Sequence, residues 1–596
     1  MRYVAAAGAA AVVTTVFVPV AGLGGAATAA TRGHVHAAHH HTPAVLRVGT
    51  YDGKRGQFRT IQAAVNAAKP GDWVLVGPGD YKTRHVKAPK GDPESPAGVL
   101  VTTPRVFIRG MNRNRVIVDG TKSGPPCSTA TRDQNFGPKD EHGTPLGLNG
   151  IMPWKASDVW VQNLTACNFL GGSGGNGNEI WWNDGDDSGK LGPGRGFLGS
   201  YMTTTSTYFH DESTAAQYGI FSSNWRGGTW NESYASNFND SGYYIGACRD
   251  VCNQVVNHAW AEWNALGYSG SNSGGRLIVK NSEFDHNEDG FDTNSQNGDN
   301  PPPQDGTCPK GRISPITHTT SCWVFMHNYV HDNNNPNVPT AGSAAAGPVG
   351  TGLSISGGRN DTVMNNVFEN NKAWGIVLVP YPDNGPPCTG GTLTPAACLY
   401  DQWGNAVFGN AFKNNGTYGN PTNGDIAALQ LEASPTDCFG SNVEVGGGAA
   451  TTSPGDAESL YPTCDGGLSV PPNPNPVFLD EVACDSGSAS LAGLPSGTVC
   501  VPGESNYPRQ TKVVMHALPG AKRKHGRPAI ENPATAKLKT MHDPCDGVPA
   551  NPWCPAEHYS HDEPTGTEYA AAAPADWLVT DSTPALRRNG AALLSR

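Results

Sequence analysis

One short motif recurs along the middle of this chain at a nearly constant interval: a glycine followed by an apolar residue that opens a strand-like run. Successive copies are 23, 25, 23, 62 and 23 residues apart, so four of the five intervals share one period. A repeat of this length, made of short strands and Asn- and Gly-rich turns, is typical of a solenoid. The copies are Gly219-Ile220, Gly242-Tyr243, Gly267-Tyr268, Gly290-Phe291, Gly352-Leu353 and Gly375-Ile376.

An asparagine-rich unit precedes several of these glycines, as in residues 281–287 and 366–370, with looser copies at 328–333 and 410–414. Stacked Asn side chains can hydrogen-bond from coil to coil along the turns of a solenoid. The leucine lattice of leucine-rich repeats is absent, and a β-sandwich would not explain the equal spacing. The repeat therefore predicts an all-β fold, a parallel β-helix, in which the residue after each motif glycine is buried and the next one faces outward.

A helix and a strand precede the repeat. Apolar residues at helical spacing predict a short amphipathic helix over residues 60–69, with Thr60 near its N-cap, and residues 73–76 form a compact apolar strand. Residues 63–81 resemble the N-terminal cap and first coil of the pectin-lyase-like right-handed parallel β-helix superfamily, and the asparagine-rich units resemble its later coils. The resemblance implies a right-handed solenoid over residues 50–432 with an N-terminal capping helix. It does not fix the chemistry, because that superfamily includes lyases, hydrolases, epimerases, transferases and non-enzymatic adhesins.

The two ends of the chain differ from this middle part. Residues 1–29 have the pattern of a secretory signal peptide, with a positive start, an apolar stretch and an Ala-x-Ala site, and a His-rich tail follows over residues 30–49. Residues 433–596 hold 20 of the 48 prolines and six of the 14 cysteines, which predicts an irregular, disulfide-rich C-terminal segment. We expect a secreted, extracellular monomer with no membrane span after signal removal.

The number of cysteines indicates disulfide bonds, and the net charge limits which partners the chain can bind. The 14 cysteines are an even number, and paired cysteines are the default in an oxidising compartment. The net charge of −11 gives no support to a nucleic-acid partner. Spacing alone does not fix connectivity, so the following local pairs are hypotheses: Cys248–Cys252, Cys308–Cys322, Cys388–Cys398 and Cys545–Cys554.

One predicted coil concentrates acidic residues. It places Asp289, Asp292 and Asn294 on the outer face, and Asp285 and His286 lie in the turn before them. Clustered carboxylates on a rigid sheet can hold Ca²⁺ through their oxygens or act as acid and base on a glycosidic bond. The alternative is a solvated polar turn. Three aromatic side chains of other coils are expected to stack on sugar rings: Tyr218, Tyr244 and Trp374.

This coil also carries a resemblance. Residues 287–292 resemble the D-D-G-x-D calcium motif of family 9 polysaccharide lyases, although Glu288 replaces the first Asp and Leu266 stands where such lyases carry another calcium ligand one coil earlier. Residues 290–292 are also similar, more weakly, to the G-F-D of mannuronan epimerases. The resemblance implies a Ca²⁺ ion bound by Asp289 and Asp292.

A second candidate lies in the insertion over residues 171–199. Its D-x-D-x-S-G order, which begins at Asp184 and Asp186, matches the opening of an EF-type calcium loop, but Arg195 stands at the twelfth position instead of Glu. A looser Ca²⁺ site and a plain polar loop both remain open.

Together these observations predict a secreted carbohydrate-active enzyme on an extracellular, acidic polysaccharide, with a lyase that binds Ca²⁺ as the leading hypothesis. In this hypothesis Asp289 and Asp292 bind the cation or an acidic sugar, and Asp285 or His286 assists proton transfer. Asn294, Tyr218, Tyr244 and Trp374 contact the substrate. The alternatives are a non-catalytic surface or glycan-binding β-helix, and an epimerase or glycoside hydrolase.

Overall fold

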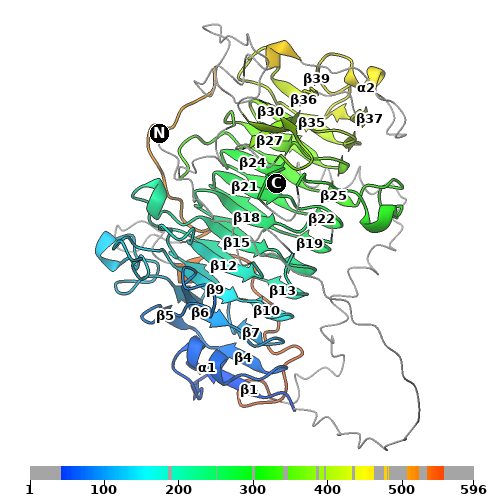
Figure 1. Cartoon of the computed structure of the whole chain (residues 1–596). Coiled ribbons are helices and arrows are strands. Elements are labelled where there is room, and N and C mark those ends of the chain that lie inside the picture. Colours follow the sequence, from blue (N-terminus) through cyan, green and yellow to red (C-terminus); the bar gives the residue numbers. More distant parts are fainter. Residues whose placement is uncertain are drawn as a thin grey trace, which may run out of the picture. The chain divides into compact units, whose positions relative to one another are not determined.

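Most strands of the chain belong to three long parallel sheets of 12, 11 and 11 strands, which we call sheets 1, 2 and 3 (Figure 1). The computed structural model describes residues 42–185, 191–249, 251–298, 302–339, 347–383, 388–394, 397–431, 436–461, 475–478, 481, 506–521 and 533–555. The predicted signal peptide and most of the His-rich tail lie outside these residues. Each coil contributes one strand to each sheet in turn. This arrangement confirms the predicted all-β fold, a right-handed parallel β-helix.

The strands of sheet 1 are β1 (Val45–Val48), β4 (Trp73–Val76), β7 (Phe107–Gly110), β10 (Val159–Gln162), β13 (Phe197–Ser200), β16 (Gly228–Asn231), β19 (Gln254–Asn257), β22 (Leu277–Lys280), β25 (Trp323–Met326), β28 (Asp361–Met364), β34 (Ala406–Phe408) and β37 (Cys438–Gly440). Those of sheet 2 are β5 (Gly79–Lys82), β8 (Val116–Asp119), β11 (Thr165–Cys167), β14 (Thr203–Thr205), β17 (Tyr234–Ser236), β20 (Trp260–Glu262), β23 (Glu283–Asp285), β26 (Tyr329–His331), β29 (Val367–Glu369), β35 (Ala411–Lys413) and β38 (Val443–Glu444). Those of sheet 3 are β6 (Ala97–Val101), β9 (Asn149–Pro153), β12 (Asn178–Asn183), β15 (Tyr218–Ser223), β18 (Ser241–Gly246), β21 (Leu266–Ser271), β24 (Asp289–Asn294), β27 (Thr351–Ser356), β30 (Trp374–Val379), β36 (Gly424–Ala428) and β39 (Thr452–Ser453).

The remaining described elements are small. Two antiparallel groups are β2 (Thr50–Tyr51) with β3 (Lys54–Arg55), and β31 (Tyr381–Asp383) with β32 (Thr392–Leu393) and β33 (Cys398–Tyr400). The helices are α1 (Ile61–Ala67) and α2 (Ala457–Leu460), with 3₁₀ turns η1 (Thr131–Asp133), η2 (Glu212–Thr214), η3 (Pro309–Gly311) and η5 (Pro533–Thr535). None of the helices in the described ranges is long and apolar enough to cross a membrane.

The capping helix forms where the sequence predicts it. The Thr60 side chain accepts a hydrogen bond from the backbone N–H of Ala63, which satisfies a donor that the helix cannot satisfy itself. Ile61, Ala64 and Val65 are buried and join the same core as the solenoid strands. The helix therefore covers the apolar start of the stack, as a terminal cap of a repeat protein must.

The residue after each motif glycine forms an inward ladder. Strand register pairs these six residues coil by coil, all are buried, and Tyr268 stacks on Phe291 with ring centroids 4.1 Å apart. The predicted orientation of the sheet 3 strands is therefore confirmed. The ladder consists of Ile220, Tyr243, Tyr268, Phe291, Leu353 and Ile376.

Asparagines also stack along the turn between sheets 2 and 3, as the asparagine-rich units predict. The Nδ2 of each donates to the Oδ1 of the next at 3.0–3.4 Å, which satisfies buried amides that water does not reach. This ladder fixes the backbone directly after the last residue of each sheet 2 strand. Its members are Asn264, Asn287, Asn333, Asn371 and Asn415.

The solenoid extends beyond both predicted boundaries. Strand β1 lies in the part assigned to the His-rich tail over residues 30–49, and β37, β38 and β39 form a further coil beyond residue 432. The repeat did not predict these two end coils because neither of them contains the glycine motif. The long interval between Gly290 and Gly352 holds two insertions, one between β24 and β25 and one between β26 and β27.

All four predicted cysteine pairs form disulfides, and a fifth joins Cys127 to Cys167. The fifth pair was not predicted because its partners are 40 residues apart and belong to different coils, Cys127 in the loop after β8 and Cys167 at the end of β11.

The described part of the C-terminal segment, residues 506–521 and 533–555, runs back along the solenoid, and we call it the strap (orange in Figure 1). Tyr507 accepts a hydrogen bond from Asn423 near the last coils. The backbone of His516 exchanges hydrogen bonds with the side chain of Asn237 at 2.8 Å, and Trp553 donates to the carbonyl of Lys54 near the first coil. The predicted irregular segment is thus a strap that contacts coils far apart along the stack.

Candidate functional site

Sheet 2 brings ionisable side chains into one outward column. Each of its middle strands has three residues, and the central one points inward and is buried. The residues on either side must then face outward. Strand register places five ionisable residues of successive coils side by side in the third position: Glu262, Asp285, His331, Glu369 and Lys413.

In each of these coils, the residue that follows the column residue in the sequence has a left-handed backbone conformation, and its side chain borders the column. Left-handed backbone favours asparagine, which holds the position at Asn370 and Asn414. The coils of Glu262 and Asp285 instead have Trp263 at φ 63° and His286 at φ 55°. The rings of these two residues contact each other with centroids 4.6 Å apart. A tryptophan in this conformation is an exception, and it occurs beside the acidic pair.

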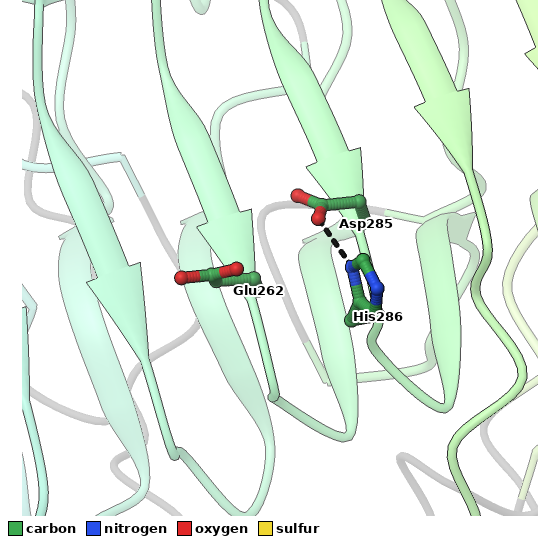
Figure 2. A group of neighbouring side chains, drawn as sticks. All are labelled: Glu262, Asp285 and His286. Atoms are coloured by element: carbon green, nitrogen blue, oxygen red, sulfur yellow. Dashed lines mark hydrogen bonds and ion pairs between the residues drawn. The ribbon is translucent and has the colours of Figure 1, made fainter. Parts of the chain in front are cut away.

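The centre of the sheet 2 group is the trio in Figure 2. Asp285 is only 3% exposed and accepts hydrogen bonds from Trp260 Nε1 at 2.7 Å and His286 Nδ1 at 2.5 Å. Glu262, 8% exposed, accepts one from Tyr234 at 2.7 Å. The His286 side chain is 41% exposed, so it is the member of the trio that solvent reaches most easily.

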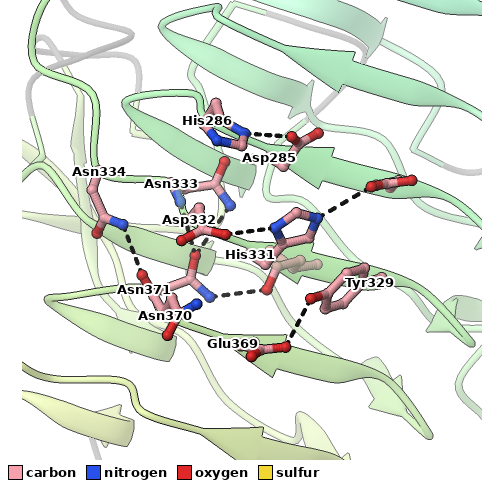
Figure 3. A network of polar contacts seen from close by, with 12 residues as sticks. Asp285, His286, Tyr329, His331, Asp332, Asn333, Asn334, Glu369, Asn370 and Asn371 are labelled. Carbon is pink, nitrogen blue, oxygen red and sulfur yellow. Dashed lines mark hydrogen bonds and ion pairs between the residues drawn. The ribbon is translucent and has the colours of Figure 1, made fainter. Parts of the chain in front are cut away.

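A second histidine lies one coil further on (Figure 3). His331 donates from Nε2 to Glu283 at 3.2 Å and from Nδ1 to Asp332 at 2.9 Å, so both ring nitrogens have carboxylate partners. Tyr329, on the same strand as His331, donates to Glu369 of the next coil at 2.7 Å. Lys413, one coil further, forms an ion pair with the same carboxylate. We call Glu262, Glu283, Asp285, His286, His331 and Asp332 the acid–histidine cluster.

Charge and burial shift the pKa values within this cluster. Burial, and then the neighbouring Asp285, raise the pKa of Glu262 to about 7. Burial lowers the pKa of His331, but the hydrogen bonds to Asp332 and Glu283 outweigh burial and raise the pKa to about 9. The hydrogen bond to Asp285 raises the pKa of His286. At neutral pH His331 is therefore a cation held between two acids.

Sheet 3 presents a different surface from the same coils. Asp292, 9% exposed, accepts hydrogen bonds from Asn294 Nδ2 and Ser356 Oγ, each at 2.7 Å, and one from Ser354 Oγ. The serines come from the next coil, so the carboxylate joins two strands. Three hydrogen-bond donors around one carboxylate hold it in a fixed orientation.

An aromatic column leads to Asp292 along sheet 3. Trp181, Phe221 and Tyr244 occupy the same register position as Asp292 in earlier coils, and Ser269 is the one residue between Tyr244 and Asp292. Trp181 stacks on Phe221 with centroids 5.0 Å apart. We call Trp181, Tyr218, Phe221 and Tyr244 the aromatic column, since Tyr218 stacks on Tyr244 at 4.8 Å.

A second carboxyl group adjoins this column. Tyr218 donates a hydrogen bond of 3.0 Å to Asp240, which is half-buried. Burial raises the pKa of Asp240 to about 7, and the charge of Asp292 contributes to the shift, so the two acids interact. Burial also raises the pKa of Asp292. Within the described ranges no Lys, Arg or His contributes to the pKa of either acid.

The structure divides the cluster that the sequence predicts. Asp285 and His286 belong to the sheet 2 surface, whereas Asp292 and Asn294 belong to sheet 3, because the chain turns between them at the asparagine ladder. Asp289 begins β24, is buried and accepts a hydrogen bond from the backbone of Thr351. The sequence placed Asp289, Asp292 and Asn294 on one outer face with Asp285 and His286 in the turn before it, and the structure instead separates Asp285 and His286 from the other three, onto sheet 2.

The other predicted residues are also separated. Tyr218 and Tyr244 do stack on each other on sheet 3, and Tyr244 lies two coils before Asp292 in the same column. Trp374 is 1% exposed, because Phe478 and Tyr507 pack on it, so it does not line an open surface. Asp184 is buried and accepts a hydrogen bond from the backbone of Gly194. Asp186 lies outside the described residues.

Several functional candidates were missed. Asp240 lies two residues before the motif glycine Gly242, whereas the motif predicts the orientation only of the residues that follow the glycine. Glu262 and His331 each follow the buried central residue of a sheet 2 strand, as the predicted Asp285 does, so the position after Ala261 and Val330 was the available signal. Glu283 and Asp332 lie at positions whose orientation the glycine motif does not predict.

The predicted Ca²⁺ ligands do not form a metal-binding set. Asp292 already receives three side-chain hydrogen bonds, and Asp289 accepts one from the backbone of the next coil. Among the described residues, the groups of three His, Cys, Asp or Glu side chains with ligand atoms close enough for one ion contain neither residue. Both groups lie on sheet 2, and Asp285 belongs to each of them. The fit to Ca²⁺ at Asp289 and Asp292 is therefore poor.

No protein-family model matches this chain, and no curated protein does. Among solved structures, the A-module of the mannuronan C-5 epimerase AlgE4 from Azotobacter vinelandii is 13% identical, with a TM-score of 0.37, over 64% of this chain and 90% of that chain. A polygalacturonase from Erwinia carotovora ssp. carotovora is 12% identical, with a TM-score of 0.36, over 69% of this chain and 95% of that one. An alginate lyase from Paenibacillus sp. str. FPU-7 is 9% identical, with a TM-score of 0.31, over 68% and 97%.

Proposed function

We propose that this protein is a secreted carbohydrate-active enzyme that binds a polysaccharide along the outer face of sheet 3 and hydrolyses its glycosidic bonds. The observation that carries the proposal is the pair of interacting acids, Asp240 and Asp292, beside the aromatic column.

The aromatic column suits a sugar polymer. Pyranose rings have apolar C–H faces, and aromatic side chains with a polar handle bind such amphipathic groups. Coils are spaced by about 4.8 Å, so the backbone positions of Tyr244 and Asp292, two coils apart, are roughly 10 Å from each other. Only the small side chain of Ser269 stands between them in the column. This distance leaves room for about one sugar unit between the last aromatic ring and the acid.

The acids suit proton transfer to a glycosidic oxygen. Glycosidases use two carboxyl groups in different protonation states, one as an acid and one as a carboxylate. With its pKa at about 7, Asp240 retains a proton near neutral pH and can donate it to the leaving oxygen. Burial raises the pKa of Asp292, and its three fixed donors oppose this rise, so Asp292 is the acid we assign to stabilise developing positive charge or to activate water as a carboxylate.

Charge favours hydrolysis over the elimination predicted from the sequence. A lyase abstracts a proton next to a uronate carboxylate and needs a cation to neutralise that group. The pKa values of Asp240 and Asp292 show no influence of a basic group from the described residues, and an acidic sugar would meet two acids. A neutral polysaccharide avoids this repulsion. A lyase on an acidic polymer stays a prediction that the same assay tests.

The test is incubation of the purified protein with a panel of neutral and acidic polysaccharides. New reducing ends without ultraviolet-absorbing unsaturated products would support hydrolysis, and unsaturated products would support the lyase. Saturable binding of a glycan without any cleavage would replace the proposal by a glycan-binding role. Asp240→Asn and Asp292→Asn should remove cleavage but retain binding, because both substitutions preserve side-chain size.

A further inference from the structure

We infer that Glu262, Asp285 and His286 bind one divalent transition-metal ion on sheet 2. The site lies on a different sheet from the proposed glycan surface and does not depend on the function proposed there.

The three ligand atoms are already close together. One carboxylate oxygen each from Glu262 and Asp285 and one ring nitrogen from His286 all lie within 4.8 Å of one another. Ligands on opposite sides of a Zn²⁺ ion are at most about 4.4 Å apart, since each bond is about 2.0–2.2 Å long. A Zn²⁺ ion can therefore be bound after local adjustment of the three side chains. Figure 2 shows the two carboxylates on neighbouring strands.

The fold holds these groups in place without a ligand. Strand register fixes Glu262 opposite Asp285, and Trp260 donates to the Asp285 oxygen that His286 does not contact. Trp263 packs between His286, at 4.6 Å, and His516 of the strap, at 3.7 Å and almost parallel. Such partners orient the first ligands of a metal site.

One carboxylate oxygen of Glu262 has no hydrogen-bond donor among the described residues. Tyr234 donates to Oε1 of Glu262, and within the described part of the chain no donor reaches Oε2. Glu262 is 8% exposed as a residue, and Asp285, its neighbour in the strand register, is 3% exposed. Two adjacent carboxylates so largely removed from water are stabilised by a shared cation or proton. A metal ion would satisfy the oxygen and both charges at once.

His286 is suited to a metal and His331 is not. Both nitrogens of His331 donate to acids, so this ring is a protonated member of an ion-pair network and has no free lone pair. His286 has one partner, Asp285, itself a member of the proposed site. The other group of potential ligands, Glu283 with Asp285 and His331, is therefore satisfied without a metal.

The donor set indicates the class of ion. An imidazole with two carboxylates suits Zn²⁺, Mn²⁺ or a similar first-row ion, whereas Ca²⁺ takes six to eight oxygen ligands. Three protein ligands leave the rest of the coordination sphere to water, as in sites that are open to solvent. The ion would also link the coils of β20 and β23.

The experiment measures Zn²⁺ binding to the full chain in a background where the five histidines within residues 34–41 are replaced by alanine, because that tract binds metals by itself. Competition with a chromogenic chelator gives stoichiometry and affinity. We expect one ion per chain. Glu262→Gln and His286→Gln should each weaken binding by at least about 100-fold, since partners that merely orient a ligand are worth about 10- to 100-fold.

Glu369→Gln is the matched control. It makes the same substitution in the same outward column, at a carboxylate already paired with Lys413, and should leave Zn²⁺ affinity unchanged. Zn²⁺ should also raise the Tm of the parent chain and of Glu369→Gln, but not that of His286→Gln. Absence of binding by the parent, or equal affinity in the parent and Glu262→Gln, overturns the site. If His286→Gln fails to fold, the near-isosteric Glu262→Gln decides the result.

Discussion

The sheet 2 and sheet 3 surfaces belong to the same coils but differ in width. The strands of sheet 2 around Asp285 have three residues, about 10 Å at the rise of a β-strand, whereas those of sheet 3 around Asp292 have six, or about 20 Å. A surface two side chains wide gathers groups around a point, which suits an ion. A surface three side chains wide, repeated over several coils, suits a polymer. In a solenoid, strand length on each face thus selects the size of ligand.

The strongest test of this division is Asp292→Ala. It should lower cleavage of the best polysaccharide by about 100- to 10,000-fold, the range for loss of a general acid or base. Zn²⁺ binding on sheet 2 should not change. Initial rates and chelator competition on the same preparation measure both effects, with Glu369→Gln as the control that retains activity. Full activity in Asp292→Ala would remove the glycan site from this face.

The two surfaces share one core, so a core substitution should weaken them together. Phe291 is fully buried between Tyr268 and Leu353. Phe291→Ala should lower the free energy of unfolding by about 3–5 kcal/mol, the usual cost of a large cavity. Denaturant unfolding measures it, ideally with both ligand assays near the transition. Loss of one activity at unchanged stability would mean that the faces are not coupled through this ladder.

The acid–histidine cluster should make stability depend on pH. The pKa of Glu262 is about 7 in the folded chain against an ordinary value of 4.5. A raised acid pKa means that its stabilising contribution is complete below pH 4.5 and is lost as the pH rises through 7. With chelator present, Glu262→Gln should be more stable than the parent at pH values above the folded pKa, by at most about 3 kcal/mol, and nearly equal to it in acid.

Denaturant titrations across this pH range give the difference directly. Asp240→Asn is the companion variant on sheet 3, since its pKa is also raised to about 7. A Glu262→Gln variant that is less stable than the parent at high pH would show that the ionised pair is compensated without a metal.

The smallest expected effect concerns the aromatic column. Tyr244→Ala should weaken glycan binding by about tenfold, or about 1.4 kcal/mol, near the upper end for one aromatic contact. Tyr329→Ala makes the same change on sheet 2 and should leave glycan affinity unaltered. Binding isotherms for both variants measure the contrast. Equal losses would indicate that the polymer crosses both faces.

The sequence predicted the inward ladder well, because that prediction needs only the period of Gly290-Phe291 and its copies. It predicted the surface less well. Whether Asp285 and Asp292 share a face depends on where the chain turns, and a single sequence does not show that residue 286 is left-handed. The register of His331 with Asp285 was hidden by the insertion between β24 and β25. The contact of Tyr507 with Trp374 could not be predicted either, because Tyr507 belongs to a segment that has no sequence repeat.

The strap has a consequence for how this protein can change in evolution. Solenoids gain and lose coils readily, since each coil contacts only its neighbours. Here a segment outside the coils contacts Asn423 near one end and Lys54 near the other. One added coil would move these two anchors apart by about 4.8 Å while the strap kept its length. Adding or removing a coil would therefore change which coils the two described parts of the strap contact, so the strap gives the number of coils a consequence beyond the contacts between neighbouring coils.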